Sequence, residues 1–144
     1  IVHGDYRIDN VMFSRDHSRA IGILDWELST LGDPMADLSY FLMSWVTPSN
    51  GRAGIGGITG GETGIPTFDE MVERYCVQTD RVGLSDLDWY FAFCQFRLMS
   101  IVQGIKKRVL DGNASHAQAE EIAARVPELA ARAWTFLERA LDER

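Results

Sequence analysis

The first 25 residues carry the feature that most constrains the fold, a loop motif followed by two short apolar runs. His3-Gly4-Asp5 comes near the start, and Asn10 follows Asp5 by five residues. Residues 10–14 and 20–24 are rich in apolar side chains and flank a short polar segment, which is typical of a β-hairpin. Such a hairpin places Asn10 and Asp25, which lie at opposite ends of the pair, at the same edge. We therefore expect three oxygen-bearing side chains to converge beside one loop.

This set of side chains suits phosphoryl transfer, which needs little covalent help from a protein. The reaction needs one carboxylate that orients a substrate hydroxyl and accepts its proton, and oxygen ligands that hold Mg²⁺ against the phosphates. Protein-kinase-like folds supply these groups with the spacing H-x-D-x-x-x-x-N, followed by a strand and an Asp. We expect Asp5 to be the catalytic base, and Asn10 and Asp25 to be the Mg²⁺ and cofactor ligands. Taken alone, a His-Gly-Asp at the end of a strand is an ordinary turn, so the prediction depends on the whole combination.

The same residues resemble the aminoglycoside phosphotransferase family of small-molecule kinases, whose catalytic loop reads H-G-D-x-x-x-x-N. The metal-binding Asp of that family often lies in a sequence like Ile-Asp-Trp-Glu, and here the sequence is Leu24-Asp25-Trp26-Glu27. The run at 28–38 is most similar to the branch that includes the kinase-like domain joined to some acyl-CoA dehydrogenases. The resemblance implies a protein-kinase-like fold, ATP and Mg²⁺ as cofactors, and transfer of the γ-phosphoryl group to a hydroxyl of a small molecule.

The resemblance also implies roles for residues around Asp5, Asn10 and Asp25. Glu27 could reach a second Mg²⁺ directly or through water, although a salt-bridging or solvated Glu fits equally well. His3 is expected to support the loop by hydrogen bonding rather than to act as an acid or base. Asp37 is expected either to buttress the same loop or to be a first-turn acid favoured by the helix dipole. Arg7 lies between Asp5 and Asn10 and could offset charge on the transferred group.

The resemblance covers the whole chain, but only as a C-terminal lobe. Residues 1–144 would then be the catalytic lobe, and the N-terminal ATP-binding lobe would be absent from this chain. Its glycine-rich loop and strand lysine, which hold the α- and β-phosphates, are expected upstream of Ile1. The chain lacks an initiator Met and opens inside a motif, so we expect it to be part of a longer protein.

Composition narrows the classes of partner. A net charge of −7 makes nucleic acid an unlikely partner, since binding there depends on clustered Lys and Arg. No apolar run of about 18 residues exists, so no membrane span is expected, and the chain is expected to be cytoplasmic. Cys76 and Cys94 both lie in apolar helical patterns and are predicted to be buried free thiols.

The remainder of the chain predicts an α+β fold, a short β-hairpin region followed by a mostly helical bundle. Ile1-Val2-His3 is predicted to end a buried strand. Helices are expected from the Asp33-Pro34 pair, from the capping box Thr67–Glu70 to about Thr79, from a second box at Ser85–Asp88 to Asp111, and from Ser115 onward.

Two further features of the helical part are expected. The third of these helices is apolar nearly all round its middle, which predicts burial on every side. Pro127 should kink the last helix or split it in two, because proline removes a backbone hydrogen bond.

The segment 48–66 carries seven glycines but does not match a phosphate-binding loop. No Gly-Lys-Ser/Thr follows, and the segment comes after a helix rather than a strand. It is therefore predicted to be a mobile connection, with a flap over the substrate as its possible role.

The acceptor is the least constrained part of the prediction. A polycationic aminoglycoside needs several acids around its site, and 48–66 offers only Glu62, so a hydroxylated acyl or similar metabolite is favoured.

Two other functions stay open. The chain could be a non-catalytic kinase-like binding or regulatory module, or an inactive fragment. A metal-dependent hydrolase that uses His3 and Asp5 would instead bind a transition metal.

We predict that the isolated 144-residue chain shows no measurable ATP-dependent turnover, because positioning of the nucleotide supplies most of this catalysis. An assay of phosphate transfer to a panel of hydroxyl acceptors tests this. Steady phosphorylation of any acceptor by the isolated chain would contradict it.

Overall fold

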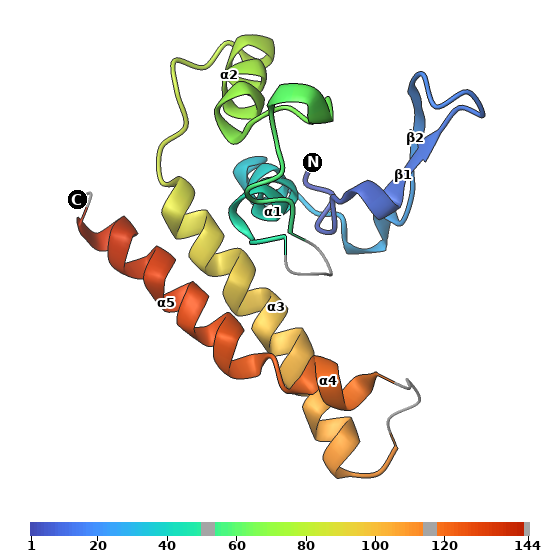
Figure 1. The fold of residues 1–144 in the computed structure, drawn as a ribbon, viewed down its shortest axis with the longest axis vertical. Coiled ribbons are helices and arrows are strands. Elements are labelled where there is room, and N and C mark those ends of the chain that lie inside the picture. The colour runs from blue at the N-terminus through green and yellow to red at the C-terminus, as the bar shows by residue number, and fades with distance from the viewer. Residues whose placement is uncertain (50–53, 114–117, 143–144) are drawn as a thin grey trace. The chain divides into compact units, whose positions relative to one another are not determined.

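A computed structural model of the chain describes residues 1–49, 54–113 and 118–142 (Figure 1). The structure divides into two compact units, Ile1–Ser85 and Asp86–Arg144. The first unit holds a two-stranded antiparallel sheet and two helices, and the second is helical. This is the α+β class predicted, with a short hairpin followed by helices.

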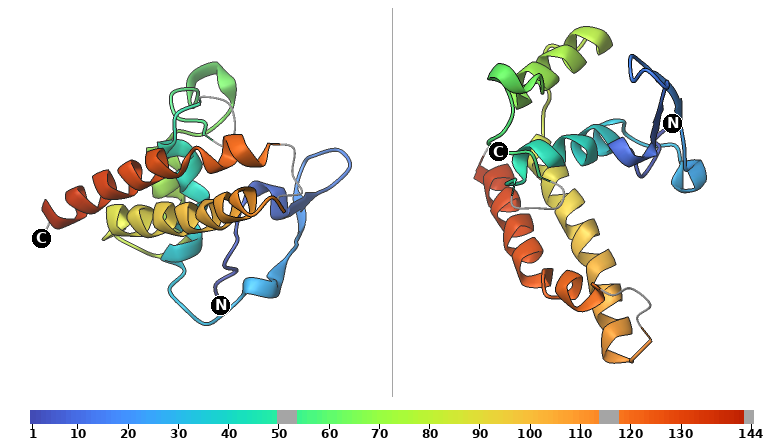
Figure 2. Two further views of the ribbon diagram at one scale, coloured as in Figure 1. Left: turned by 90° about the horizontal axis from the view of Figure 1, so that it is seen from below. Right: turned by 45° about the vertical axis from the view of Figure 1, so that its right-hand side comes forward.

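The hairpin pairs β1 (Val11–Phe13) with β2 (Ala20–Ile23), in a register that sets Val11 opposite Ile23. It extends away from the helices α1 and α2 of the same unit (Figures 1 and 2). The first strand is shorter than expected, because Asn10 belongs to a preceding 3₁₀ turn, Ile8–Asn10. The two strands are therefore the predicted ones, with no boundary moved by more than one residue.

The strand expected at Ile1-Val2-His3 is reduced to a single bridge. Val2 and Thr30 exchange two backbone hydrogen bonds of 2.8 and 2.9 Å, and no ladder continues from them. The reason is local, since Gly4 has φ +85° and turns the chain out of the extended conformation. Val2 is nevertheless buried, with 5% of its surface exposed, whereas Ile1 is exposed.

Helix α1 spans Met35–Val46 and begins as the sequence predicts. The Asp33 carboxylate accepts a hydrogen bond of 2.9 Å from the Met35 N–H, and Pro34 lies between them. Leu38 and Leu42 are buried and place one face of the helix in the core of the first unit.

Helix α2 spans Phe68–Thr79 and opens with the predicted capping box. The Glu70 N–H donates to the Thr67 hydroxyl, and the Thr67 N–H donates to the Glu70 carboxylate at 2.6 Å. Pro66, which precedes the N-cap residue Thr67, is bonded to α1, because the Trp45 indole N–H donates to the Pro66 carbonyl at 2.8 Å. Residues 50–53 of the glycine-rich segment lie outside the described residues, and residues Gly61–Thr63 form a short 3₁₀ helix.

The second unit contains α3 (Leu87–Leu110), α4 (Ala119–Ala123) and α5 (Val126–Asp142). Helices α3 and α5 lie side by side and antiparallel (Figures 1 and 2). Phe91 and Phe136 meet in their interface with ring centroids 5.2 Å apart, and both are buried. The last helix is split in two as predicted, with the break at residues 124–125 and Pro127 in the first turn of α5, while the expected start at Ser115 lies outside the described residues.

Two expectations for α3 are wrong. Asp86 precedes the helix with φ 59° and makes no side-chain cap hydrogen bond, so the second capping box is absent. Burial all round the helix is also not observed, because Trp89, Phe93 and Phe96 are 42%, 45% and 58% exposed.

Two predictions about the chain as a whole can be compared with the structure. Cys76 and Cys94 are buried thiols, as predicted, and neither forms a disulfide. Within residues 1–49, 54–113 and 118–142, no helix combines the length and apolarity needed to cross a membrane.

We predict that Thr67→Ala lowers the free energy of unfolding by about 1 kcal/mol, because it removes the side-chain acceptor at the start of α2. Thermal denaturation of the two proteins measures the effect. Thr79→Ala is the control, since its hydroxyl bonds only to the Tyr75 carbonyl near the other end of the helix. Equal losses from the two substitutions would contradict the capping role.

The same box should make stability depend on pH. Hydrogen bonds from the Thr67 N–H and hydroxyl lower the pKa of Glu70 from its ordinary value of 4.5. A lowered pKa means that the stabilisation is complete above pH 4.5 and is lost as the pH falls through the folded-state pKa. The difference in melting temperature between wild type and Thr67→Ala should therefore narrow in acid.

Candidate active site

The loop that carries Asp5 turns at Gly4, where the backbone leaves no room for a side chain. Gly4 has φ +85°, and a Cβ placed on it would lie 2.6 Å from the Leu28 carbonyl oxygen. Contacts that short do not occur between real atoms, and left-handed φ values disfavour other residues. A glycine is therefore required at the position where protein kinases carry an arginine.

The start of α1 is joined to this loop by one side chain. The Asp37 carboxylate accepts the N–H of His3 at 2.5 Å and the N–H of Gly4 at 2.9 Å, one through each oxygen. Both bonds are partly buried and charge-assisted, which makes them stronger than bonds between neutral groups. The role expected for Asp37 as a support of the loop is consistent with these contacts and stays a prediction.

His3 lies at the centre of the loop and is almost completely buried, with 3% of its surface exposed. Its Nε2 lies 2.7 Å from the Leu24 carbonyl oxygen, and its Nδ1 lies 3.2 Å from the Asp5 backbone nitrogen. A carbonyl only accepts and a backbone N–H only donates, so this geometry corresponds to a neutral imidazole protonated on Nε2. With both ring nitrogens engaged, His3 has none left for a metal ion, which weighs against the hydrolase alternative.

Asp5 and Asn10 are in direct contact. The Asn10 side-chain N–H₂ donates to the Asp5 backbone carbonyl at 2.8 Å and to the Asp5 carboxylate at 3.1 Å. Because the amide nitrogen is turned toward Asp5, the amide oxygen of Asn10 remains available as a ligand. The structure thus brings together the predicted base and one of the predicted Mg²⁺ ligands.

Asp25 occupies the turn between β2 and the 3₁₀ helix Trp26–Leu28, in a left-handed conformation with φ 66°. The Leu24 N–H donates to the Asn10 carbonyl at 2.8 Å, so Asn10 is bonded to the residue just before Asp25. Asp25 and Glu27 are exposed, and neither carboxylate has a hydrogen-bond or ion-pair partner among the described residues. Both carboxylates are thus free of protein partners on the described part of the chain.

The donor set can be compared with what Mg²⁺ requires. No group of three or more His, Cys, Asp or Glu side chains on the described part of the chain could hold a metal ion. The predicted ligands instead combine the amide oxygen of Asn10 with the carboxylate of Asp25. This chemistry fits Mg²⁺, which binds hard oxygen ligands, keeps several waters and takes only one or two carboxylates from a protein.

Arg7, which was considered as a counter-charge for the transferred phosphoryl group, pairs with a carboxylate of the protein. Its guanidinium forms an ion pair with Asp9 on the same loop. Burial alone would lower the pKa of Arg7, but the hydrogen bond and charge of Asp9 outweigh it and raise the pKa above its ordinary value. Its charge is therefore directed to Asp9 rather than left free for a transferred phosphoryl group.

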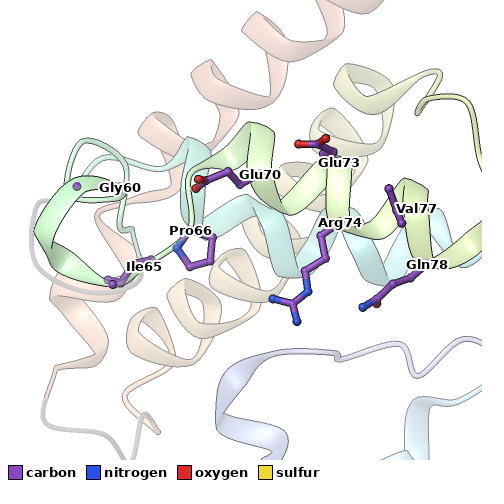
Figure 3. Close-up of a pocket in the computed structure, with 10 residues that line it drawn as sticks. Gly60, Ile65, Pro66, Glu70, Glu73, Arg74, Val77 and Gln78 are labelled. Carbon is purple, nitrogen blue, oxygen red and sulfur yellow. The ribbon is translucent and has the colours of Figure 1, made fainter.

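A cavity of about 500 Å³ lies beside the loop, entirely within the first unit. Its walls are mainly apolar and aromatic, and its lining includes His3, Tyr6, Trp26, Asp37, Phe41, Arg74, Tyr75 and Gln78. The Tyr6 and Phe41 rings lie 5.5 Å apart, which joins the loop to α1. A second cavity of about 630 Å³ lies between residues 60–66 and α2, and Arg74 and Gln78 line it as well (Figure 3).

The sequence analysis missed the α2 side of the first cavity. Met71, Arg74, Tyr75 and Gln78 recur at spacings of three and four, which places them on one helical face. That periodicity was visible in the sequence, but it mixes polar and apolar residues and so lacks the signature of a core-facing stripe.

We predict that Asp37→Asn in the full-length protein lowers the free energy of unfolding by about 2 kcal/mol. An asparagine can accept one of the two N–H groups, but its own N–H₂ would then face the other. Melting temperature and faster amide hydrogen exchange at His3 and Gly4 measure the effect. Asp69→Asn is a matched control, because Asp69 is also a first-turn acid and its side chain makes no hydrogen bond to a described residue. Unchanged exchange at both amides would contradict the prediction.

Comparison with known proteins gives consistent results. The phosphotransferase enzyme family (APH) matches residues 1–73. Acyl-CoA dehydrogenase family member 10 from Mus musculus is 38% identical over 138 residues, which cover 94% of this chain and 13% of that protein. Family member 11 from Gallus gallus is 36% identical over 134 residues, covering 90% of this chain and 17% of that protein. The chain thus spans less than a fifth of the length of these relatives.

A solved structure extends the likeness to three dimensions. The crystal structure of a predicted aminoglycoside phosphotransferase from Ralstonia eutropha JMP134 superposes with a TM-score of 0.88 and 43% sequence identity. The match covers 96% of this chain and 42% of the other. Both the resemblance drawn from the motifs and the kinase-like α+β fold are thereby confirmed. The chain belongs to the phosphotransferase enzyme family (APH).

Proposed function

We propose that this chain is the catalytic C-terminal lobe of an ATP-dependent small-molecule kinase. The observation that carries the proposal is the contact between Asp5 and Asn10, together with the backbone bond that joins Asn10 to Leu24 beside Asp25. In this arrangement the proposed base and the two proposed oxygen ligands belong to segments joined by hydrogen bonds, although Asp5 and Asp25 lie 20 positions apart in sequence. Family membership supports phosphotransfer as the chemistry.

In the proposed reaction, each side chain has a distinct role. Asp5 would accept a hydrogen bond from the acceptor hydroxyl, orient its oxygen toward the γ-phosphorus and take its proton as the new O–P bond forms and the bond to the departing ADP breaks. Asn10 holds the Asp5 carboxylate through its N–H₂ group and offers its amide oxygen to Mg²⁺. Asp25, and Glu27 at a second position, supply carboxylate oxygens. Mg²⁺ and ATP, when bound, supply the phosphoryl group and neutralise charge that develops on it.

His3 and Asp37 act in this proposal as supports of the loop and take no part in the proton transfer. His3 links the Asp5 N–H to the Leu24 carbonyl, so it joins the base loop to the segment of the predicted metal ligand. Asp37 fixes the backbone just before Asp5. The nucleotide-holding lobe is proposed to come from the longer protein, since the solved relative is more than twice as long as the part that this chain matches.

The acceptor is proposed to be a small hydroxylated metabolite. The similarity to the acyl-CoA dehydrogenase family members favours a hydroxylated acyl compound. The aromatic lining of the 500 Å³ cavity supports the same choice over an aminoglycoside, which would require clustered carboxylates.

We predict that Asp5→Ala in the full-length protein lowers kcat by about 10²- to 10⁴-fold, because it removes general-base catalysis. Asp16→Ala is the control, since Asp16 lies in the exposed hairpin turn and bonds only to nearby serines. Phosphate transfer to hydroxyl acceptors is measured beside calorimetric binding of Mg·ATP. Retained kcat in Asp5→Ala would remove the base assignment. Tight Mg·ATP binding by a wild-type protein that phosphorylates no acceptor would support the regulatory-module alternative instead.

A further inference from the structure

The cavity beside the loop combines aromatic rings with a few polar side chains. Tyr6, Trp26 and Phe41 line it, and the Phe41 ring continues the aromatic contact to Trp45 at 5.3 Å. Helix α2 contributes two polar side chains, Arg74 and Gln78, which are one helical turn apart. A volume of about 500 Å³ falls in the range of small-molecule sites, which are typically apolar with a few directional polar groups.

Arg74 is the cation of this cavity. Its side chain is exposed and makes no hydrogen bond or ion pair with any described residue. The Arg74 and Gln78 side chains extend on the same side of α2, and Glu73, which lines the second cavity with them, points away from both (Figure 3). Glu70, which is four residues before Arg74 and could have paired with it, is held by Thr67 in the capping box.

The other ionisable groups of the cavity form no ion pair with Arg74. Asp37 lines the cavity and keeps its negative charge, but each of its oxygens accepts a backbone N–H and it forms no ion pair with Arg74. The hydrogen bonds of His3 correspond to a neutral ring. A ligand in the cavity therefore meets an unpaired guanidinium, an adjacent side-chain amide and several aromatic rings.

We propose that Arg74, assisted by Gln78, binds an anionic group of the acceptor, and that the apolar body of the acceptor lies against Tyr6, Trp26 and Phe41. The acceptor class is then a hydroxylated organic acid or acyl compound that carries a carboxylate or a phosphate. A guanidinium suits this task, because its donors match both anions in a fixed planar geometry. A polycationic sugar is disfavoured by the same charge. This inference rests on the proposed function for the identity of the hydroxyl-bearing ligand as a phosphoryl acceptor.

Binding measurements on the full-length protein test the anion site without turnover. The probes are 10-hydroxydecanoate, its uncharged methyl ester and 10-hydroxydecyl phosphate, each titrated by calorimetry. Wild type should bind the acid more tightly than the ester. Arg74→Gln should weaken binding of the acid by about tenfold to a hundredfold and leave the ester unchanged. Arg74→Lys should recover part of the loss, since it keeps the charge but not the planar donors.

Arg81→Gln is the matched control. It removes one positive charge from an exposed position just after α2, and Arg81 does not line the cavity. Acid affinity in this variant should equal that of wild type. A phosphate that binds more tightly than the carboxylate, with the same dependence on Arg74, would support the site and assign phosphate as its group.

The inference and the proposed function can fail separately. Equal affinity of wild type for acid and ester, or an equal loss of both in Arg74→Gln, would overturn the anion site even if phosphoryl transfer is observed. An acid-selective site that depends on Arg74, in a protein that transfers no phosphate from Mg·ATP, would leave the anion site standing and end the kinase proposal.

Discussion

The candidate site depends on two hydrogen bonds that one carboxylate accepts from the backbone. Asp37 and the His3-Gly4 amides are more than 30 residues apart in sequence, and the whole hairpin lies in the chain between them. Closing a loop of that size costs conformational entropy, which local turns would not recover by themselves. The position of the Asp5 backbone is therefore set by where α1 begins, and only indirectly by its own neighbours.

His3 extends this arrangement from one segment to two. Its buried ring contacts the Asp5 backbone on one side and the Leu24 carbonyl on the other, while the Trp26 ring lies 4.7 Å from it. A buried ring that bonds to a donor and an acceptor at once holds the two at a fixed distance, since moving either partner leaves a polar group without a hydrogen bond. The base loop and the turn that carries Asp25 are thus held as one piece, even though the carboxylate of Asp25 itself is exposed.

Local chemistry explains which features could be predicted from the sequence. The hairpin, the capping box at Thr67 and the split before Pro127 each depend on residues within a few positions of one another. The contact between Asn10 and Asp5 also follows from short spacing, while the roles of Asn10, Asp25 and Glu27 toward Mg²⁺ stay predictions. The wrong expectations fail for the same reason. Asp86 adopts a left-handed conformation that its side-chain pattern does not reveal. The strand expected at Val2 ends because Gly4 turns the chain with φ +85°, at a position where a Cβ would meet the carbonyl oxygen of distant Leu28.

The hydrogen bond from the Trp45 indole to the Pro66 carbonyl makes insertions before Pro66 differ in their effect from insertions after it. Arg74 lies on α2, whose first turn is set by Thr67. Pro66, the residue before Thr67, is bonded to α1. Insertions before Pro66 change only the connection and leave the orientation of the helix to this hydrogen bond. One residue inserted between Thr67 and Arg74 would instead rotate everything beyond it by about 100° around the helix axis. Homologues that keep Arg74 and Gln78 on one face of α2 should therefore vary in chain length before Pro66 and not after it.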